Sequence, residues 1–168
     1  MGTASCIAKS QVLHAGYVLR LAAVADADTI AFQRAAMFAE MGTSYSEEHT
    51  TQFAPWIRDR LSGGTYLGLL IEHAGQVVAG AGLMFLDWPP SHLDPGSRRA
   101  YLLNVYTEPK HRGCGLARAL TQAAIHETRA RGIAVLALHA SEAGRPLYTK
   151  LGFQATNEMR FLTSVQGS

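Results

Sequence analysis

A segment rich in glycine and basic residues, Lys110–Gly115, has residue types that suit it to binding an anion. It follows an apolar run that predicts a strand over Ala100–Thr107, and Pro109 ends that strand. A helix is predicted from Leu116 to about Arg131, so the segment lies at a helix N-terminus, where free N–H groups and a partial positive charge favour anions. Glycines let an anion approach the backbone closely. The sequence therefore predicts a phosphate or pyrophosphate site here.

Other motifs with known chemistry are excluded because residues are missing at the required spacing. The chain contains no Gly-Lys pair, which a P-loop needs. Arg118 stands where a dinucleotide-binding fingerprint requires Gly or Ala. His126–Glu127 has no second histidine at the metalloprotease spacing. The two cysteines, Cys6 and Cys114, are too few for a disulfide framework and too far apart for a zinc site, so we expect no metal.

Two short motifs in the C-terminal half resemble those of one enzyme family. Arg112–Ala117 matches the pattern Arg/Gln-x-x-Gly-x-Gly/Ala, and Pro146–Phe153 contains Tyr-x-x-x-Gly-Phe about thirty residues later. Both are typical of the GNAT superfamily of acetyl-CoA-dependent N-acetyltransferases. Because the motifs occur in the right order, separated by one predicted helix and one strand, the chain resembles that superfamily from about Gly75 to Phe153.

The resemblance implies that acetyl-CoA is the cosubstrate. The backbone of Val105 and Thr107 would pair with the pantetheine arm, because the family's strand splays away from its neighbour there, and the Val105 N–H would also support the thioester oxyanion. The amides from Arg112 to Ala117 would hold the pyrophosphate. Ser141 stands where many members have an asparagine that contacts the cofactor. The implied cofactor-binding residues are Val105, Tyr106, Thr107, Arg112, Gly113, Cys114, Gly115, Leu116, Ala117, Arg118 and Ser141.

The resemblance also implies that Tyr148 is the general acid for the departing CoA thiolate. A tyrosine with a pKa of about 10 stays protonated at neutral pH, whereas a thiol has a pKa of about 8.5. The general base has no clear candidate: Asn104 stands where a base would be convenient. Candidates from elsewhere are Glu40, Asp87, His92 and Asp94, and a water chain is a further alternative. His139 is interpreted as a core histidine on a buried strand.

The elements that must position these residues can be read from periodicity and turn signals. Residues 1–16 lack periodicity and predict an irregular leader, and residues 17–168 a single domain. The predicted strands are Tyr17–Leu21, Thr65–Glu72, Gln76–Leu86, Ala100–Thr107, Ile133–Ala140 and Phe153–Thr163. The predicted helices begin after Asp26 and end at Gly42, run from a Ser44/Glu47 capping box to Gly63, run from the glycine turn to about Arg131, and span Glu142–Leu151. The prolines place a long loop over Asp87–Arg99.

This element order predicts a GNAT-like α/β (α+β) fold. The central sheet would be mixed and mostly antiparallel, splayed between two neighbouring strands, with helices on both faces. Acetyl-CoA would enter between Ala100–Thr107 and Ile133–Ala140. The acceptor site would be built from the first two helices, the Asp87–Arg99 loop and the terminal strand near Asn157–Met159.

Composition and charge narrow the class of protein. The chain has 168 residues, 48% of them hydrophobic and 17% charged, which favours one globular domain over disorder. No apolar run is long enough for a membrane helix and no signal peptide is recognised, so we expect a cytoplasmic protein without a membrane partner. Residues Arg98–Lys150 hold nine basic and three acidic residues, which suits an anionic ligand.

The sequence therefore predicts an acetyltransferase that transfers an acetyl group from acetyl-CoA to a primary amine of a small molecule or peptide by direct attack. Two alternatives stay open: a transferase for a different acyl-CoA and a non-catalytic sensor that binds acyl-CoA. A nucleic-acid partner is not expected, because no recognition motif accompanies the basic residues. A homodimer that uses the terminal strand also stays open.

Overall fold

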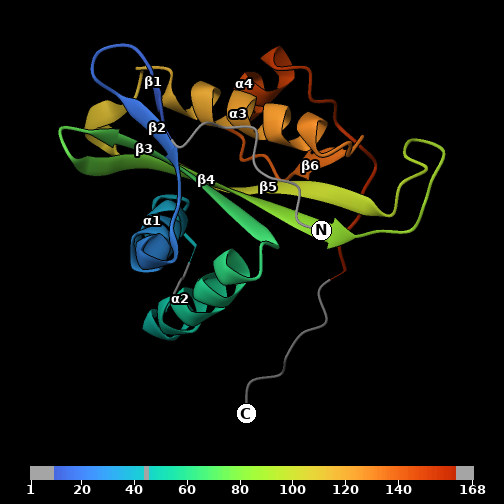
Figure 1. The fold of residues 1–168 in the computed structure, drawn as a ribbon, viewed down its shortest axis with the longest axis horizontal. Coiled ribbons are helices and arrows are strands. Elements are labelled where there is room, and N and C mark those ends of the chain that lie inside the picture. The colour runs from blue at the N-terminus through green and yellow to red at the C-terminus, as the bar shows by residue number, and fades with distance from the viewer. Residues whose placement is uncertain (1–9, 44–45, 162–168) are drawn as a thin grey trace.

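The computed structural model describes residues 10–43 and 46–161, which form one six-stranded sheet with the order β1-β2-β3-β4-β5-β6 (Figure 1). Neighbouring strands are antiparallel except β5 and β6, which are parallel. The predicted mixed, mostly antiparallel α/β fold is therefore confirmed. The strands are β1 Ser10–Val12, β2 Val18–Leu21, β3 Tyr66–His73, β4 Gln76–Asp87, β5 Arg98–Thr107 and β6 Leu136–Leu138. The helices are η1 Val24–Asp26, α1 Ala27–Glu40, α2 Glu47–Ser62, η2 Pro109–His111, α3 Leu116–Ala130 and α4 Arg145–Lys150.

The sheet lies between two layers of helix, with α1 and α2 on one face and α3 on the other (Figure 1). Strand β3 explains both contacts, because its successive side chains point to opposite faces. Leu69 and Ile71 belong to the core cluster that includes Leu120 of α3. Tyr66 and Leu70 belong to the cluster beneath α1 and α2. Burial on both faces accounts for the unbroken apolar run of this strand.

Glycines in β4 permit a close approach between the sheet and its neighbours. A Cβ built at Gly82 would lie 2.0 Å from the hydroxyl oxygen of Tyr66. A Cβ at Gly80 would lie 2.2 Å from Oε1 of Gln33 on α1. The register between β4 and β5 also shifts between these two glycines. The sequence pattern of two small residues on one face therefore marks both a close approach and a bulge.

Several predicted boundaries are wrong. Ser10–Val12 forms an edge strand inside the segment predicted to be irregular, because backbone pairing with β2 needs no apolar pattern. Arg98 and Arg99 belong to β5 rather than to the preceding loop. The Ser44 cap lies outside the described residues, and Ser46 caps α2 instead. Within the strand predicted over Ile133–Ala140, only the half-buried β6 forms, and among the described residues it pairs with β5 alone.

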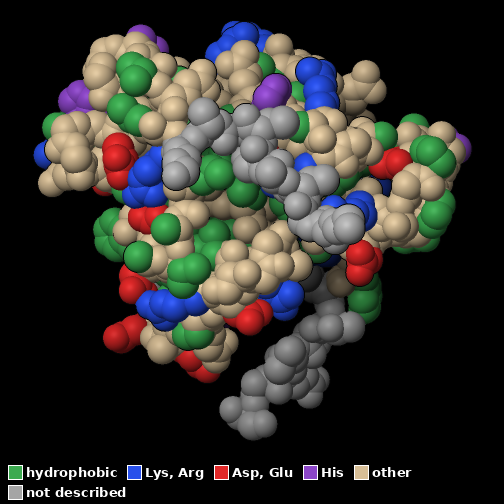
Figure 2. Space-filling model, in the orientation of Figure 1, with side chains coloured by type: hydrophobic (Ala, Val, Ile, Leu, Met, Phe, Trp, Pro, Cys, Tyr) green, Lys and Arg blue, Asp and Glu red, His purple; other side chains and the backbone are tan. Residues whose placement is uncertain are grey.

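The terminal strand predicted from Phe153 is absent from the described residues up to Phe161. Met159 and Phe161 are 94% and 89% exposed there. Alternating apolar residues were not sufficient, because a strand is stabilised by cross-strand pairs and none forms in this segment. The loop between β4 and β5 projects at the right of Figures 1 and 2 and carries exposed Trp88 and Leu93. None of the described helices is long and apolar enough to cross a membrane.

Candidate functional site

A cavity of about 1220 Å³ follows the line along which β5 and β6 separate. The two strands pair only from Ala100 with Leu136 to Leu102 with Leu138. Beyond that point, the edge of β5 that was paired with β6 faces the cavity, while its other edge stays paired with β4. This is the splay that the sequence predicts, and it leaves backbone N–H and C=O groups of β5 available to a ligand.

A β-bulge in β5 lies directly beyond the last paired residues. Two residues, Asn104 and Val105, stand opposite Ala81 alone, and Asn104 has φ +55°. Asparagine tolerates this left-handed conformation better than most residues. Its side chain is buried, and Oδ1 accepts a hydrogen bond from Nη1 of Arg34 on α1. The bulge is thus held by a hydrogen bond from Arg34, which lies 70 residues before Asn104 in the chain.

Two buried polar atoms at this part of the cavity have no hydrogen-bond partner among the described residues. They are Nδ2 of Asn104 and Oγ1 of Thr107. Both residues line the cavity. A buried donor without a partner costs free energy, and such groups are retained where a ligand completes them. Both atoms are shielded from the cavity in this structure, and the Asn104 amide lies beside the buried hydroxyl of Tyr66 on β3.

The glycine turn lies at the other end of the cavity and leads into α3. Gly113 and Gly115 have φ +78° and +76°, and a Cβ at either position would meet nothing within 4 Å. Gly115 is the N-cap of α3 and has no side chain to satisfy the first N–H groups of the helix. These amides face open space beside Arg118, as an anion-binding site requires.

Arg112 is held in place at this end of the cavity by two contacts. Its Nη2 lies 2.6 Å and 2.7 Å from the two carboxylate oxygens of Glu40, at the end of α1. Its Nε donates to the backbone oxygen of Thr107 at 3.0 Å. Arg112 therefore ties α1 to the end of β5. Glu40 lines the cavity but is committed to this ion pair, which lowers its value as a base.

Tyr148 comes from α4 and lines the same cavity. Its ring packs edge-on against Phe153, with centroids 5.8 Å apart. Burial raises the pKa of the Tyr148 hydroxyl, so the group is protonated throughout the neutral range. Ser141, seven residues earlier, also lines the cavity, and its Oγ accepts a hydrogen bond from the Gly144 N–H at 3.1 Å.

The structure brings together all but one of the residues implied as cofactor-binding: Val105, Tyr106, Thr107, Arg112, Gly113, Gly115, Leu116, Ala117, Arg118 and Ser141 line the cavity with Tyr148. Cys114 does not line it. Its backbone oxygen lies 3.0 Å from Nε2 of His14, at the opposite side of the turn.

Other candidates named from the sequence lie away from the cavity. Asp87 and His92 do not line it. Asp94 is buried and structural, because its carboxylate accepts hydrogen bonds from the N–H groups of Gly96 and Ala134 at 2.8 Å and 3.0 Å. The Asp87–Arg99 loop contributes no residue to the lining, and neither does α2. The expected acceptor surface is therefore reduced to α1 and the C-terminal segment, represented by Arg160.

Sequence reasoning missed three residues at this site. Arg34 and Tyr101 line the cavity, although no motif contains them. His139 lines it as well and is exposed, so the interpretation as a core histidine is wrong. Tyr101 and His139 share a hydrogen bond between the phenol oxygen and Nδ1. The apolar residues around His139 suggested burial, but the splay uncovers this end of β6.

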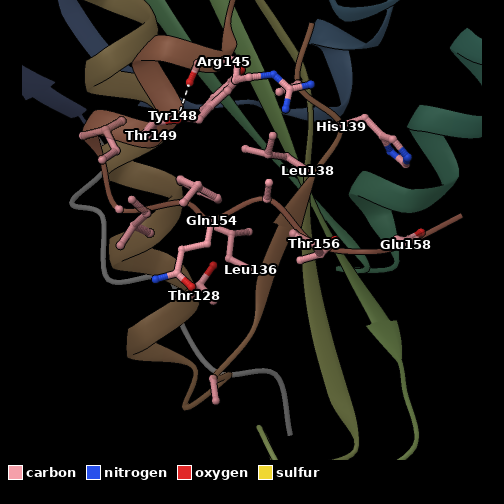
Figure 3. Close-up of a pocket in the computed structure, with 18 of the residues that line it drawn as sticks. Thr128, Leu136, Leu138, His139, Arg145, Tyr148, Thr149, Gln154, Thr156 and Glu158 are labelled. Atoms are coloured by element: carbon pink, nitrogen blue, oxygen red, sulfur yellow. Dashed lines mark hydrogen bonds between the residues drawn. The ribbon is translucent and has the colours of Figure 1, made fainter.

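A second cavity, of about 690 Å³, lies between α3, β6 and the segment after α4 (Figure 3). Tyr148 and His139 line both cavities. Thr128 and Thr149 line only the second, on the side of β6 toward the helices. Within residues 10–43 and 46–161, no group of His, Cys, Asp and Glu is arranged to hold a metal ion.

Comparison with known proteins gives consistent matches. The sequence profile of the acetyltransferase (GNAT) family matches residues 30–153. A glucosamine 6-phosphate N-acetyltransferase of Trypanosoma brucei brucei is 33% identical over 84 residues, which is 50% of this chain and 55% of that protein. The chain thus spans about half the length of this curated relative.

Two solved structures match over most of their length. A GCN5-related N-acetyltransferase from Ralstonia eutropha JMP134 is 37% identical, with a TM-score of 0.81 over 88% of this chain and 99% of that one. A predicted acetyltransferase from Clostridium acetobutylicum, solved with acetyl-CoA, is 28% identical, with a TM-score of 0.82 over 88% and 96%.

Proposed function

The chain belongs to the acetyltransferase (GNAT) family, and from this membership we propose that it transfers an acetyl group from acetyl-CoA to a primary amine of a small molecule or peptide. One observation carries the proposal. A single cavity joins an open strand edge at β5, an anion site at the N-terminus of α3, and the protonated hydroxyl of Tyr148. These are the groups needed to hold a thioester, to hold its phosphates, and to protonate a departing thiolate.

The residues present fit acetyl-CoA. The open space over Gly113 and Gly115 would admit the pyrophosphate to the amides of α3, with Arg118 beside it. The edge of β5 that β6 leaves uncovered near Val105 and Thr107 would pair with the pantetheine amides, while the other edge stays paired with β4. When bound there, acetyl-CoA supplies an activated acyl group on a thiol leaving group.

The residues of the bulge would stabilise charge on the thioester oxygen. The backbone N–H of Val105 would donate to that oxygen, and the partnerless Nδ2 of Asn104 lies on the same stretch of β5. A donor fixed in advance stabilises developing charge without reorganisation, and removal of one such donor costs about 10²–10³-fold in kcat. The geometry of Asn104, held by Arg34, supports this preorganisation.

The acceptor amine would attack the thioester carbonyl directly, so that the new N–C bond forms as the C–S bond breaks. Tyr148 would give its proton to the leaving sulfur. Burial keeps that proton in place at neutral pH by raising the pKa of the hydroxyl. The sequence motif assigns the same role to Tyr148, and its position on the cavity wall supports it.

The acceptor would bind between α1 and the C-terminal segment. Met37 and Phe38 of α1, with Met41 directly after the helix, give this part of the cavity an apolar wall, and Arg34 and Arg160 give it positive charge. A small amine that carries an anionic group would suit these side chains. The similarity to an enzyme named for glucosamine 6-phosphate supports a small-molecule acceptor.

The proposal is tested by measuring CoA release from acetyl-CoA with a panel of amines: glucosamine 6-phosphate, amino acids, polyamines and peptides. Mass spectrometry is the readout, because the free thiol of Cys114 would react with a thiol dye. Tyr148→Phe is measured beside the wild-type protein. Loss of a general acid lowers kcat by about 10²–10⁴-fold.

Acetyl-CoA binding, followed by calorimetry, serves as the control for the Tyr148→Phe protein. We expect its affinity to stay close to that of the wild type, since the hydroxyl makes no hydrogen bond to another described residue. Turnover with one class of amine that is lost in the variant supports the proposal. Acetyl-CoA binding without turnover of any amine would contradict it and favour an acyl-CoA sensor.

A further inference from the structure

The hydrogen-bonded pair Tyr101 and His139 lies on the wall of the functional cavity but has no role in the mechanism proposed above. The two side chains come from neighbouring strands and from positions 38 residues apart in the sequence. Their rings lie with centroids 5.7 Å apart at 49°. A histidine is the side chain whose charge changes between pH 5 and pH 8, so its presence here has chemical consequences.

The position of the pair in the sheet places it beside the reacting end of the cavity. Tyr101 stands opposite Ala137 in the parallel ladder, and His139 follows two residues later, on the same face. The ladder ends with Leu102 and Leu138. The pair therefore lies at the point where β5 and β6 begin to separate, next to the bulge at Asn104.

The ring of His139 is accessible from the cavity. The side chain is exposed and lines the cavity together with Tyr148. In Figure 3 it projects from the end of β6 away from Thr128 and Thr149, which lie on the opposite side of the strand. Tyr101 binds only Nδ1, and Nε2 has no hydrogen bond to another described residue.

We propose that His139 is the general base for the acceptor amine and that Tyr101 holds it in the reactive tautomer. This inference rests on the proposed acetyl transfer and names the group that the mechanism still lacks. Nδ1–H donates to the Tyr101 oxygen, so Nε2 carries the lone pair that accepts a proton. Tyr101 is a positioning residue, and His139 contacts the substrate.

The protons balance over the whole reaction. Nε2 of His139 takes one proton from the substrate ammonium, which makes the nitrogen nucleophilic. The N–C bond forms as the C–S bond breaks, and the hydroxyl of Tyr148 gives its proton to the sulfur. The second proton shed by the nitrogen restores Tyr148, and His139 returns its proton to solvent. The net products are the acetamide, CoA and one proton.

Charged and titratable side chains from several elements line the two cavities that His139 lines. Those that line the functional cavity are Arg34, Glu40, Tyr101, Tyr106, His111, Arg112, Arg118, Glu142, Tyr148 and Arg160. In the second cavity His139 also faces Arg145 and Glu158. Neither Glu142 nor Glu158 belongs to β5 or β6, whereas His139 directly follows β6 at the point where the two strands separate.

The first test needs no acceptor. Nitrogen-15 NMR of the imidazoles, with His139 assigned by its loss in His139→Gln, reports which nitrogen carries the proton in the neutral ring. We expect the Nδ1–H tautomer in the wild-type protein and a shift toward Nε2–H in Tyr101→Phe. A wild-type protein with the proton on Nε2 overturns the proposal.

The second test follows kcat/KM from pH 6 to pH 10 with glucosamine 6-phosphate, or with the panel amine that gives the highest turnover. At pH 7, His139→Gln should lower the rate by about 10²–10⁴-fold. The deficit should shrink as pH rises, because the acceptor then enters as the free amine and needs no base. Tyr101→Phe should show the same trend with a smaller loss.

His92→Gln is the matched control, since His92 is exposed on the loop between β4 and β5 and lines neither cavity. It should leave the pH profile unchanged. A deficit of His139→Gln that does not change with pH overturns the base role and leaves the proposed transfer intact. Absence of turnover with every amine overturns the transfer itself, and the base role with it.

Discussion

Gly115 and Gly132 lie at opposite ends of α3 with similar backbone conformations, so substitution of each by Ala separates backbone strain from loss of an anion site. Their φ angles are +76° and +66°. A Cβ would meet nothing within 4 Å at either position. Gly115 lines the functional cavity, whereas Gly132 does not. Both variants should therefore lose stability through backbone strain, and only Gly115→Ala should also lose affinity for acetyl-CoA.

The shared cost is the strain of a left-handed residue with a Cβ. It amounts to about 1–2 kcal/mol for a residue other than glycine. In a domain of this size each kcal/mol lowers Tm by about 2–4 °C. We expect both variants to be destabilised by this amount, because neither new methyl group meets a neighbour.

The second cost concerns acetyl-CoA alone. A methyl group at Gly115 would fill the space through which a phosphate reaches the first N–H groups of α3. A hydrogen bond to a charged group contributes about 1.5–3 kcal/mol. Loss of one such bond raises Kd by about 10- to 150-fold. Gly132→Ala should leave Kd within about twofold of the wild type, since it alters no group near the cavity.

Calorimetric titration with acetyl-CoA and chemical denaturation measure the two costs on the same samples. Equal affinities for the two variants would refute the pyrophosphate site at the N-terminus of α3. If both affinities fell equally, the loss would be due to the lower stability of α3 and not to a blocked anion site.

Two further predictions concern the framework. Asp26 accepts hydrogen bonds from Arg20 at 2.8 Å and 2.9 Å, and these bonds lower the pKa of the Asp26 carboxyl. The stabilisation that this pair gives the folded protein is present above the unfolded pKa of about 3.9. It is lost as pH falls through the lower pKa of the folded state. Asp26→Asn should therefore lower the free energy of unfolding by about 1–3 kcal/mol at pH 7 and by progressively less below pH 4 in urea denaturation, whereas exposed Asp28→Asn should change it by less than about 1 kcal/mol. At the bulge, Asn104→Gly keeps a residue that tolerates φ +55°, so Asn104→Ala should be less stable than Asn104→Gly by about 1–2 kcal/mol; equal stabilities in urea denaturation would mean that the bulge relaxes.

Local sequence signals were sufficient for the elements that hold the site. The apolar runs of β3 and β4 were located because both faces of these strands are buried, and the stripes of α2 and α3 because each helix buries one face. The turn before α3 was located because glycine conformation and helix N-terminal polarity depend on adjacent residues alone. Ten of the residues implied by the motifs line one cavity for that reason.

Contacts between distant segments were beyond the reach of these signals. The hydrogen bonds from Arg34 to Asn104 and between Tyr101 and His139 join positions 70 and 38 residues apart. The burial of His139 was misjudged because it depends on where β5 and β6 separate, and the sequence of neither strand indicates that point. The edge strand β1 was missed for a related reason, since its side chains are exposed and only its backbone is paired.

The bulge in β5 links the irregularities of this fold to one another. An extra residue at Asn104 shifts the register against β4, and the ladder with β6 ends two residues before it. A regular β5 would satisfy its backbone with a neighbouring strand, and the edge that faces the cavity would then be unavailable to a ligand. The hydrogen bond from Arg34 helps to hold Asn104 in its left-handed conformation, and Nδ2 lies buried beside the hydroxyl of Tyr66.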